Sequence, residues 1–82
     1  MSISTAKLEP IARDIGFTES HLRITLVDGR ELRVPLAWFP RLNKATVADR
    51  ENWQLIGGGL GIHWPAIDED VSVENLLVPR TP

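Results

Sequence analysis

The sequence HLRITLVDGRELRV, residues 21–34, decides the fold because apolar and polar residues alternate on both sides of an Asp-Gly pair. Alternation with period two is typical of strands that bury one face. A two-residue turn at Asp28-Gly29 would place Leu26 opposite Glu31, which mixes the apolar and charged faces. The two-residue turn is therefore rejected.

A three-residue loop over residues 27–29 restores a single apolar face. It aligns two apolar pairs, Ile24 with Leu32 and Leu22 with Val34. Such a loop is a type I turn followed by a bulge, and its last residue adopts the left-handed conformation that glycine favours. The pattern predicts an antiparallel hairpin in which Gly29 has a structural role and a positive φ.

A weaker strand precedes this hairpin, over residues 11–17. Three apolar residues share one of its faces at period two: Ile11, Ile15 and Phe17. Arg13 interrupts that same face. Residues 18–20 form a turn, and parity requires an even loop there, which aligns Phe17 with Leu22 and Ile15 with Ile24. We therefore predict a three-stranded antiparallel meander.

Two prolines break the chain after the third strand. Pro35 ends the strand because proline cannot donate to a ladder, and residues 36–39 can form one helical turn after it. Pro40 opens another short helical segment over residues 40–44. These breaks predict short elements rather than a long helix.

A second hairpin is predicted around three consecutive glycines. Thr46 with Asp49 three residues later resembles a capping box and starts a helix. The predicted elements are this helix through about Asn52, a strand over 53–56, a turn at 57–59 and a strand over 60–64.

The predicted C-terminal element is a short helix with apolar residues at helical spacing. Ser72 caps it, residues 73–77 form it, and Pro79 stops it. The carboxylates at 68–70 are interpreted as charges that favour the positive N-terminus of this helix. The fold class is therefore α+β: a meander, short helices, a second β-hairpin and a short C-terminal helix.

The composition predicts one small domain. The chain has 82 residues, a hydrophobic fraction of 43% and no cysteine, so disulfides and thiolate metal sites are excluded. Residues 1–10 show no period and are interpreted as an N-terminal arm, with disorder as one reading. Residues 11–82 form the domain. Without an apolar run that could span a bilayer or serve as a signal peptide, we expect no membrane partner and a cytoplasmic location.

Charge is distributed unevenly along the chain. The formal net charge is −2, which disfavours nucleic-acid binding by the protein itself. Residues 30–50 carry a local charge of +3, whereas residues 68–82 carry −3. Internal complementarity or two solvated faces explain this asymmetry more simply than steering of a partner.

Catalysis, metal binding and cofactor binding find little support in the sequence. His63, Asp68 and Asp70 are plausible ligand types, yet their spacing matches no ligand template, so a structural role is preferred. The glycine-rich run 57–61 is followed by a strand and lacks the lysine of a phosphate-binding loop. We predict no catalytic residue, no metal ligand and no cofactor.

Three tryptophans are the largest apolar side chains in the chain. Trp53 and Trp64 fall in predicted strands and are assigned to the core, and Pro65 follows as a structural residue. Trp38 lies in the proline-bounded segment, where core packing and partner contact are equally favoured. With Arg41 and Arg50 it makes the predicted partner-binding set, because tryptophan and arginine are typical of binding hot spots.

Several short motifs together resemble one prokaryotic family. They are Asp28-Gly29-Arg30, Val34-Pro35-Leu36, Trp38-Phe39-Pro40-Arg41-Leu42, Arg50 to Trp53, Gly61-Ile62-His63-Trp64-Pro65, Ile67 to Asp70 and Leu76-Leu77. The chain resembles the domain of unknown function family number twenty-four forty-two from about Ile11 to Leu77. Members are short proteins, commonly encoded beside another small protein in type II toxin–antitoxin pairs, and some add a helix-turn-helix domain.

The resemblance implies a bacterial, non-enzymatic, antitoxin-like protein that neutralises a cognate small toxin encoded nearby by binding it directly. Because the resemblance covers nearly the whole chain, we expect the DNA-binding domain to be absent here. The alternative is a ligand- or nucleic-acid-binding accessory module that uses the region from Arg30 to Arg50. An enzyme around His63, Asp68 and Asp70 is the third hypothesis. A small domain also gains stability from a partner, so self-association is a further expectation.

Overall fold

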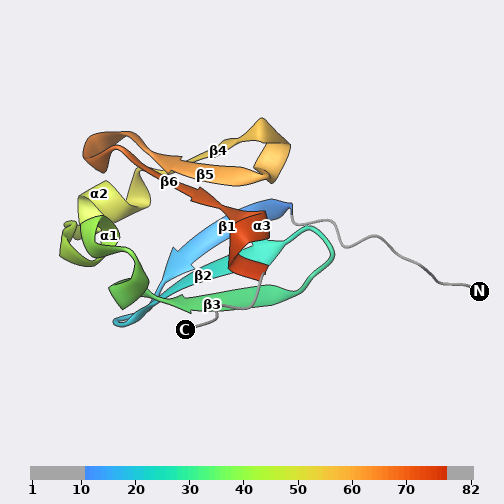
Figure 1. The fold of residues 1–82 in the computed structure, drawn as a ribbon, viewed down its shortest axis with the longest axis horizontal. Coiled ribbons are helices and arrows are strands. Elements are labelled where there is room, and N and C mark those ends of the chain that lie inside the picture. The colour runs from blue at the N-terminus through green and yellow to red at the C-terminus, as the bar shows by residue number, and fades with distance from the viewer. Residues whose placement is uncertain (1–10, 78–82) are drawn as a thin grey trace, which may run out of the picture.

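Two three-stranded antiparallel sheets, joined by short helices, make up the fold (Figure 1). The computed structural model describes residues 11–77. The predicted arm, residues 1–10, lies outside the described residues, as does the predicted stop at Pro79. None of the helices in this described range is long and apolar enough to cross a membrane. The α+β class predicted from the sequence is confirmed.

The first sheet has the predicted meander order and register. Its strands are β1 (Ala12–Phe17), β2 (His21–Leu26) and β3 (Glu31–Pro35). The observed apolar pairs are Ile24 with Leu32, Leu22 with Val34, Phe17 with Leu22 and Ile15 with Ile24. Gly29 closes the three-residue loop with a φ of 97°, and its N–H donates to the Leu26 carbonyl at 3.0 Å. The register argument is therefore confirmed.

One detail of the first strand differs from the prediction. A register shift between Ala12 and Asp14 makes Arg13 the extra residue of a bulge. Ala12 therefore takes a buried place beside Ile15, while Arg13 is exposed and Ile11 is only half-buried. The period-two reading that put Arg13 on the apolar face was wrong, because the bulge turns its side chain away from the core.

Short helical segments follow at one end of the molecule, at the left of Figure 1. A 3₁₀ turn spans Leu36–Trp38, α1 spans Pro40–Lys44 and α2 spans Val47–Glu51. Thr46 is the N-cap of α2, and its Oγ1 accepts from the Asp49 N–H at 3.1 Å. These elements match the predicted helical segments closely.

The second sheet contains the predicted hairpin and one additional strand. Its strands are β4 (Gln54–Ile56), β5 (Gly61–Trp64) and β6 (Glu69–Ser72), in that order. The sequence pattern placed the carboxylates at 68–70 before the N-terminus of the last helix. Instead, the chain reverses at a 3₁₀ turn over Pro65–Ile67, and Glu69 and Asp70 pair with β5 as part of β6. The helix α3 (Val73–Leu77) begins only afterwards, and the Asn75 N–H donates to Ser72 Oγ at 3.4 Å.

The core lies between the inner faces of the two sheets. Buried apolar residues from both sheets and from the linking segments form one cluster: Ala12, Ile15, Leu22, Ile24, Leu26, Leu36, Leu42, Ile62, Trp64, Val71 and Val73. The glycine turn of the second sheet touches the first, since a Cβ at Gly59 would lie 2.6 Å from the Ala12 carbonyl oxygen. The absence of a side chain at Gly59 therefore allows the two sheets to approach each other closely.

Candidate partner-binding surface

A groove of about 440 Å³ lies between the C-terminal half of β1 and the segment that carries α2. Residues 15–19 form one wall, and Val47, Arg50, Glu51 and Trp53 line the other. Val47 is 68% exposed, the largest exposure of any large apolar residue in the described range. A concave surface with apolar walls and a few charged groups is the usual form of a binding site.

Arg50 joins four elements of the fold. Its Nε donates to the Leu42 carbonyl at 2.9 Å and its Nη2 to the Asn43 carbonyl at 3.0 Å, so its guanidinium caps the C-terminus of α1. The guanidinium carbon lies 5.6 Å from the centre of the Phe17 ring. The Arg50 carbonyl accepts the Trp64 indole N–H at 3.0 Å. Arg50 therefore has a structural role as well as a place in the groove wall.

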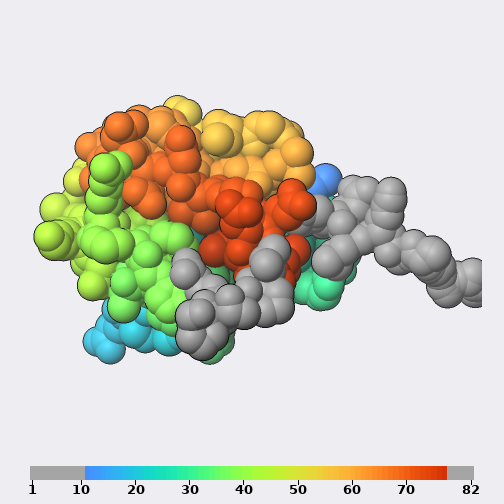
Figure 2. Space-filling view, viewed as in Figure 1, coloured from blue at the N-terminus to red at the C-terminus, as the bar shows by residue number. Residues whose placement is uncertain are grey.

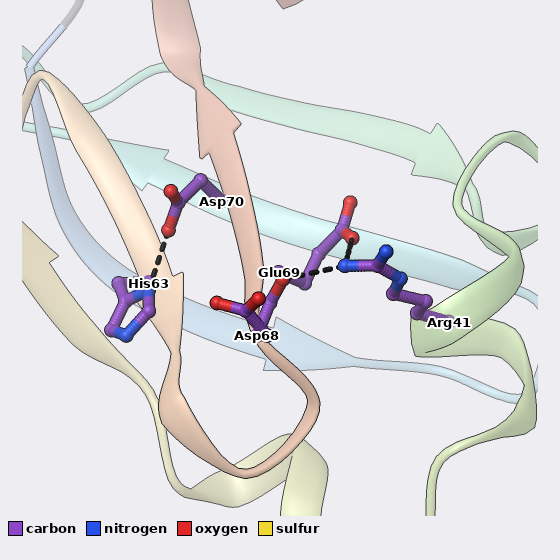
Figure 3. A network of polar contacts seen from close by, with 5 residues as sticks. All are labelled: Arg41, His63, Asp68, Glu69 and Asp70. Carbon is purple, nitrogen blue, oxygen red and sulfur yellow. Dashed lines mark hydrogen bonds and ion pairs between the residues drawn. The ribbon is translucent and has the colours of Figure 1, made fainter.

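Arg41 lies in α1, and Trp38 lies in the 3₁₀ turn before it. Arg41 Nη1 donates to the Asp68 carbonyl at 2.6 Å and lies 3.7 Å from Glu69 Oε1 (Figure 3). Figure 2 shows the α1 segment, in green, lying against the β5–β6 turn, in orange. Trp38 is 44% exposed. Arg41 and Arg50 thus contact different neighbours, and the partner-binding role of the three residues stays a prediction.

The residues assigned a structural role have distinct surroundings. Trp64 is fully buried and its ring meets Phe17 edge-on, with centroids 6.3 Å apart. Trp53 is half-buried and packs against the core, one residue before β4 begins. Pro65 is exposed and opens the 3₁₀ turn after β5. Trp53 therefore packs against the core and also lines the groove.

His63 and Asp70 form a pair across β5 and β6. They face each other in the register, and His63 Nδ1 lies 2.5 Å from Asp70 Oδ1 (Figure 3). Asp68 has a left-handed backbone conformation at the preceding turn, and its side chain does not contact the pair in Figure 3. The residues that the structure describes contain no group of three or more metal-ligating side chains. The pair is best explained as a cross-strand contact of the second sheet.

Only the loop between β2 and β3 carries clear pKa shifts among the described groups. The Arg30 side chain hydrogen-bonds Asp28, with Nε 2.8 Å from Oδ2, and the Arg30 backbone N–H also donates to that carboxylate. These bonds lower the pKa of Asp28 and raise that of Arg30. Both side chains are exposed, and neither lines the groove.

Residues 12–82 match the model of a family described as a protein of unknown function, DUF2442. The chain belongs to DUF2442. Neither the curated proteins nor the solved structures gave a match. The resemblance seen in the sequence motifs is therefore confirmed, and the groove of this DUF2442 chain lies wholly within the matched residues.

Several groove residues of this DUF2442 chain were not predicted from its sequence. Val47 was read only as part of a capped helix, and Gly16 only as part of a strand. A signal existed for Val47, since an apolar residue at the first position of an isolated short helix has little chance of burial. No local signal marks Gly16, because its importance depends on a neighbouring strand.

Proposed function

We propose that this chain is a non-enzymatic, antitoxin-like protein that neutralises a small toxin encoded nearby by binding it directly. The observation that carries the proposal is the groove, where the exposed Val47 and half-buried Trp53 stand beside β1, an edge strand. Single exposed apolar side chains are common on protein surfaces, but apolar side chains grouped in a concave surface are typical of binding sites. The bacterial, cytoplasmic setting is part of the same proposal.

The groove supports protein binding better than chemistry. Its charged lining groups are Glu19, Glu51 and Arg50, and Arg50 already donates to two carbonyls of α1. Two of the Arg50 donors are thus already used within the protein. An apolar side chain of a partner would instead bury Val47 and the exposed part of Trp53, which is favourable by about 25 cal/mol per Å².

Co-expression with the protein encoded beside this chain tests the proposal. We expect relief of growth arrest and a complex that survives purification. Val47→Asp should weaken the complex strongly, because it places a charge in the apolar wall. Val27→Asp is the matched control, since Val27 is also exposed, at 52%, but lies in the loop after β2.

Two residues of the predicted set, Trp38 and Arg41, are tested in the same assay. Trp38→Ala with Arg41→Ala should weaken the complex while the circular dichroism spectrum stays unchanged, if the surface extends to α1. A complex that responds to Val47→Asp alone would confine the surface to the groove. If no complex forms and growth arrest persists, the antitoxin proposal is wrong.

A further inference from the structure

We propose that the free edge of β1 accepts a short extended segment of a partner protein as a fourth strand of the first sheet. A carboxylate side chain of that segment would bind Arg23, which reaches across β1 on the outer face of the sheet, and Arg33 on β3 would add to the positive charge there. The inference rests on the proposed function, because it gives the chemistry of the partner at the same groove.

The hydrogen-bond pattern of β1 leaves two residues facing outward. The Thr18 N–H donates to the His21 carbonyl at 2.9 Å, and hydrogen-bonded pairs alternate along an antiparallel ladder. Gly16 is therefore bonded to β2, whereas Ile15 and Phe17 direct their N–H and C=O groups away from it. Both residues also line the groove. A segment in the groove would thus meet unpaired backbone groups of an edge strand, as in β-augmentation.

Gly16 brings an arginine of the central strand to this edge. The Arg23 guanidinium lies over Gly16, since a Cβ added there would be 3.0 Å from Arg23 Nη2. The φ of Gly16 is not in the left-handed region, so the backbone does not require glycine. Glycine inside a strand often marks the close approach of another group. Here the absent side chain lets Arg23 reach across β1.

Two arginines face each other at the centre of this outer face, and Asp14 and Glu31 flank Thr25 in the neighbouring row of the register. Arg23 and Arg33 are direct partners in the register of β2 and β3. They form a non-hydrogen-bonded pair, since the flanking bonds are Leu26 N–H to Arg30 and Leu36 N–H to Ser20. Side chains are closest in such pairs, and like charges opposite each other are destabilising.

Arg23 also has a hydrogen-bond donor that is not paired within the described residues. Within residues 11–77, its Nε is buried and has no acceptor. A buried donor without a partner is costly, and native structures rarely keep one without a reason. A carboxylate beside Gly16 would accept from the Arg23 fork and separate the two like charges.

The two sides of the edge select different side chains. Successive residues of a strand point to opposite faces, so an added strand would place one set in the groove and the other on the outer face. Glu19 and Glu51 line the groove with Val47 and Trp53 and disfavour a carboxylate there. The occupant is therefore an extended segment in which apolar residues alternate with aspartate or glutamate.

A synthetic peptide of alternating valine and glutamate, titrated to millimolar concentration and followed by amide NMR, tests the inference. Binding should slow hydrogen exchange at Ile15 and Phe17, with little change at Gly16, whose N–H is already bonded. The peptide with lysine in place of glutamate should bind at least about tenfold more weakly, the effect of losing one charge-assisted hydrogen bond. Equal binding of the two peptides, or no protection at Ile15 and Phe17, would overturn the inference.

Two variants separate binding from folding. Gly16→Ala should keep the fold, because the clashing atom is the flexible end of Arg23, yet weaken peptide binding. Arg33→Glu should raise the melting temperature by removing the like-charge pair, while lowering peptide affinity about tenfold. Lys44→Glu, an equal charge change on α1, is the control. If Arg33→Glu weakens binding no more than Lys44→Glu, the carboxylate assignment is wrong.

Other occupants give different results. The peptide could fail to bind while a single-stranded oligonucleotide changes the NMR signals of Arg23 and Arg33, with an affinity that falls steeply as salt is added. That result would replace the proposal by nucleic-acid binding. If the neighbouring protein binds this chain but the peptide leaves Ile15 and Phe17 unchanged, the inference fails and the proposed function stands.

Discussion

The two sheets share one strand order but are stabilised differently. The first sheet has strands of five or six residues joined by tight turns, and apart from the bulge at Arg13 its apolar and polar residues alternate. The strands of the second sheet have three or four residues, and other elements contact it at several points: Gly59 on Ala12, the Trp64 indole on Arg50, and Arg41 on the Asp68 carbonyl.

This difference shows where stability comes from in so short a chain. An isolated hairpin of short strands is marginal in water, so the second sheet depends on being packed against the first sheet and the helices. The first sheet depends less on packing against other elements, because its register follows from the alternation of its own apolar residues. Substitutions at the contacts of the second sheet should therefore cost more than equivalent changes in the first.

The largest effect is expected for Trp64→Ala. It removes a fully buried ring and the hydrogen bond to the Arg50 carbonyl, and should cost about 3 to 5 kcal/mol. That is much of the stability of a small domain, so urea titration should show a largely unfolded variant. Trp38→Ala, at a 44% exposed position, is the control. A loss at Trp64 no larger than at Trp38 would contradict the assigned core role.

Gly59→Ala should have the next largest effect. The added Cβ would meet the Ala12 carbonyl oxygen at 2.6 Å and Ile11 Cγ2 at 2.7 Å, and the φ of 103° is strained for alanine. Strain and overpacking together should cost about 2 to 4 kcal/mol. Differential scanning calorimetry measures this loss. Near-wild-type stability would show that the two sheets do not depend on this contact.

Gly29→Ala should lower the stability less than Gly59→Ala, and the two variants together compare the first sheet with the second. The φ at Gly29 is 97°, but nothing lies within 4 Å of a Cβ built there. The cost should be the left-handed strain alone, about 1 kcal/mol. The difference between the two glycine variants isolates the packing of the second sheet on the first. Equal losses in the calorimeter would remove that distinction.

Asp28→Asn should cause the smallest loss of stability, and that loss should be present at neutral pH but not at acidic pH. The Arg30 bonds depress the pKa of Asp28 below its ordinary 3.8, so this carboxylate adds stability at neutral pH and loses that effect as pH falls through the depressed value. The melting temperatures of the wild type and the variant should differ slightly near about pH 7 and converge near about pH 2. A difference independent of pH would rule out the charged pair as its cause.

Sequence patterns predicted the first sheet almost completely and the second only in part. Leu22, Ile24, Leu32 and Val34 specify a register because one slip would expose all of them. The strand β6 was missed because Glu69 and Asp70 lack an apolar alternation, and Asp70 pairs only with a histidine on β5. The bulge at Arg13 was missed since period two alone cannot reveal an extra residue.

The candidate site was predicted less well than the fold. Trp53 and Arg50 were named from residue type, and both line the groove. Gly16 and Arg23 were not named, because their relation exists only when β1 and β2 are paired. Residue type predicts which side chains bind well, whereas the position of an edge strand requires the fold.

Arg50 makes the substitutions around it interdependent. It contacts Phe17, the last carbonyls of α1 and the Trp64 indole at once. Changes at residues that share a partner do not add, with interaction energies of about 0.5 to 3 kcal/mol. A double-mutant cycle of Phe17→Leu and Trp64→Phe should give different coupling energies with Arg50 present and with Arg50→Ala, since that substitution removes the contact with Phe17 but keeps the backbone carbonyl that accepts from the Trp64 indole. Substitutions at these positions are therefore expected to be tolerated in combinations rather than one at a time.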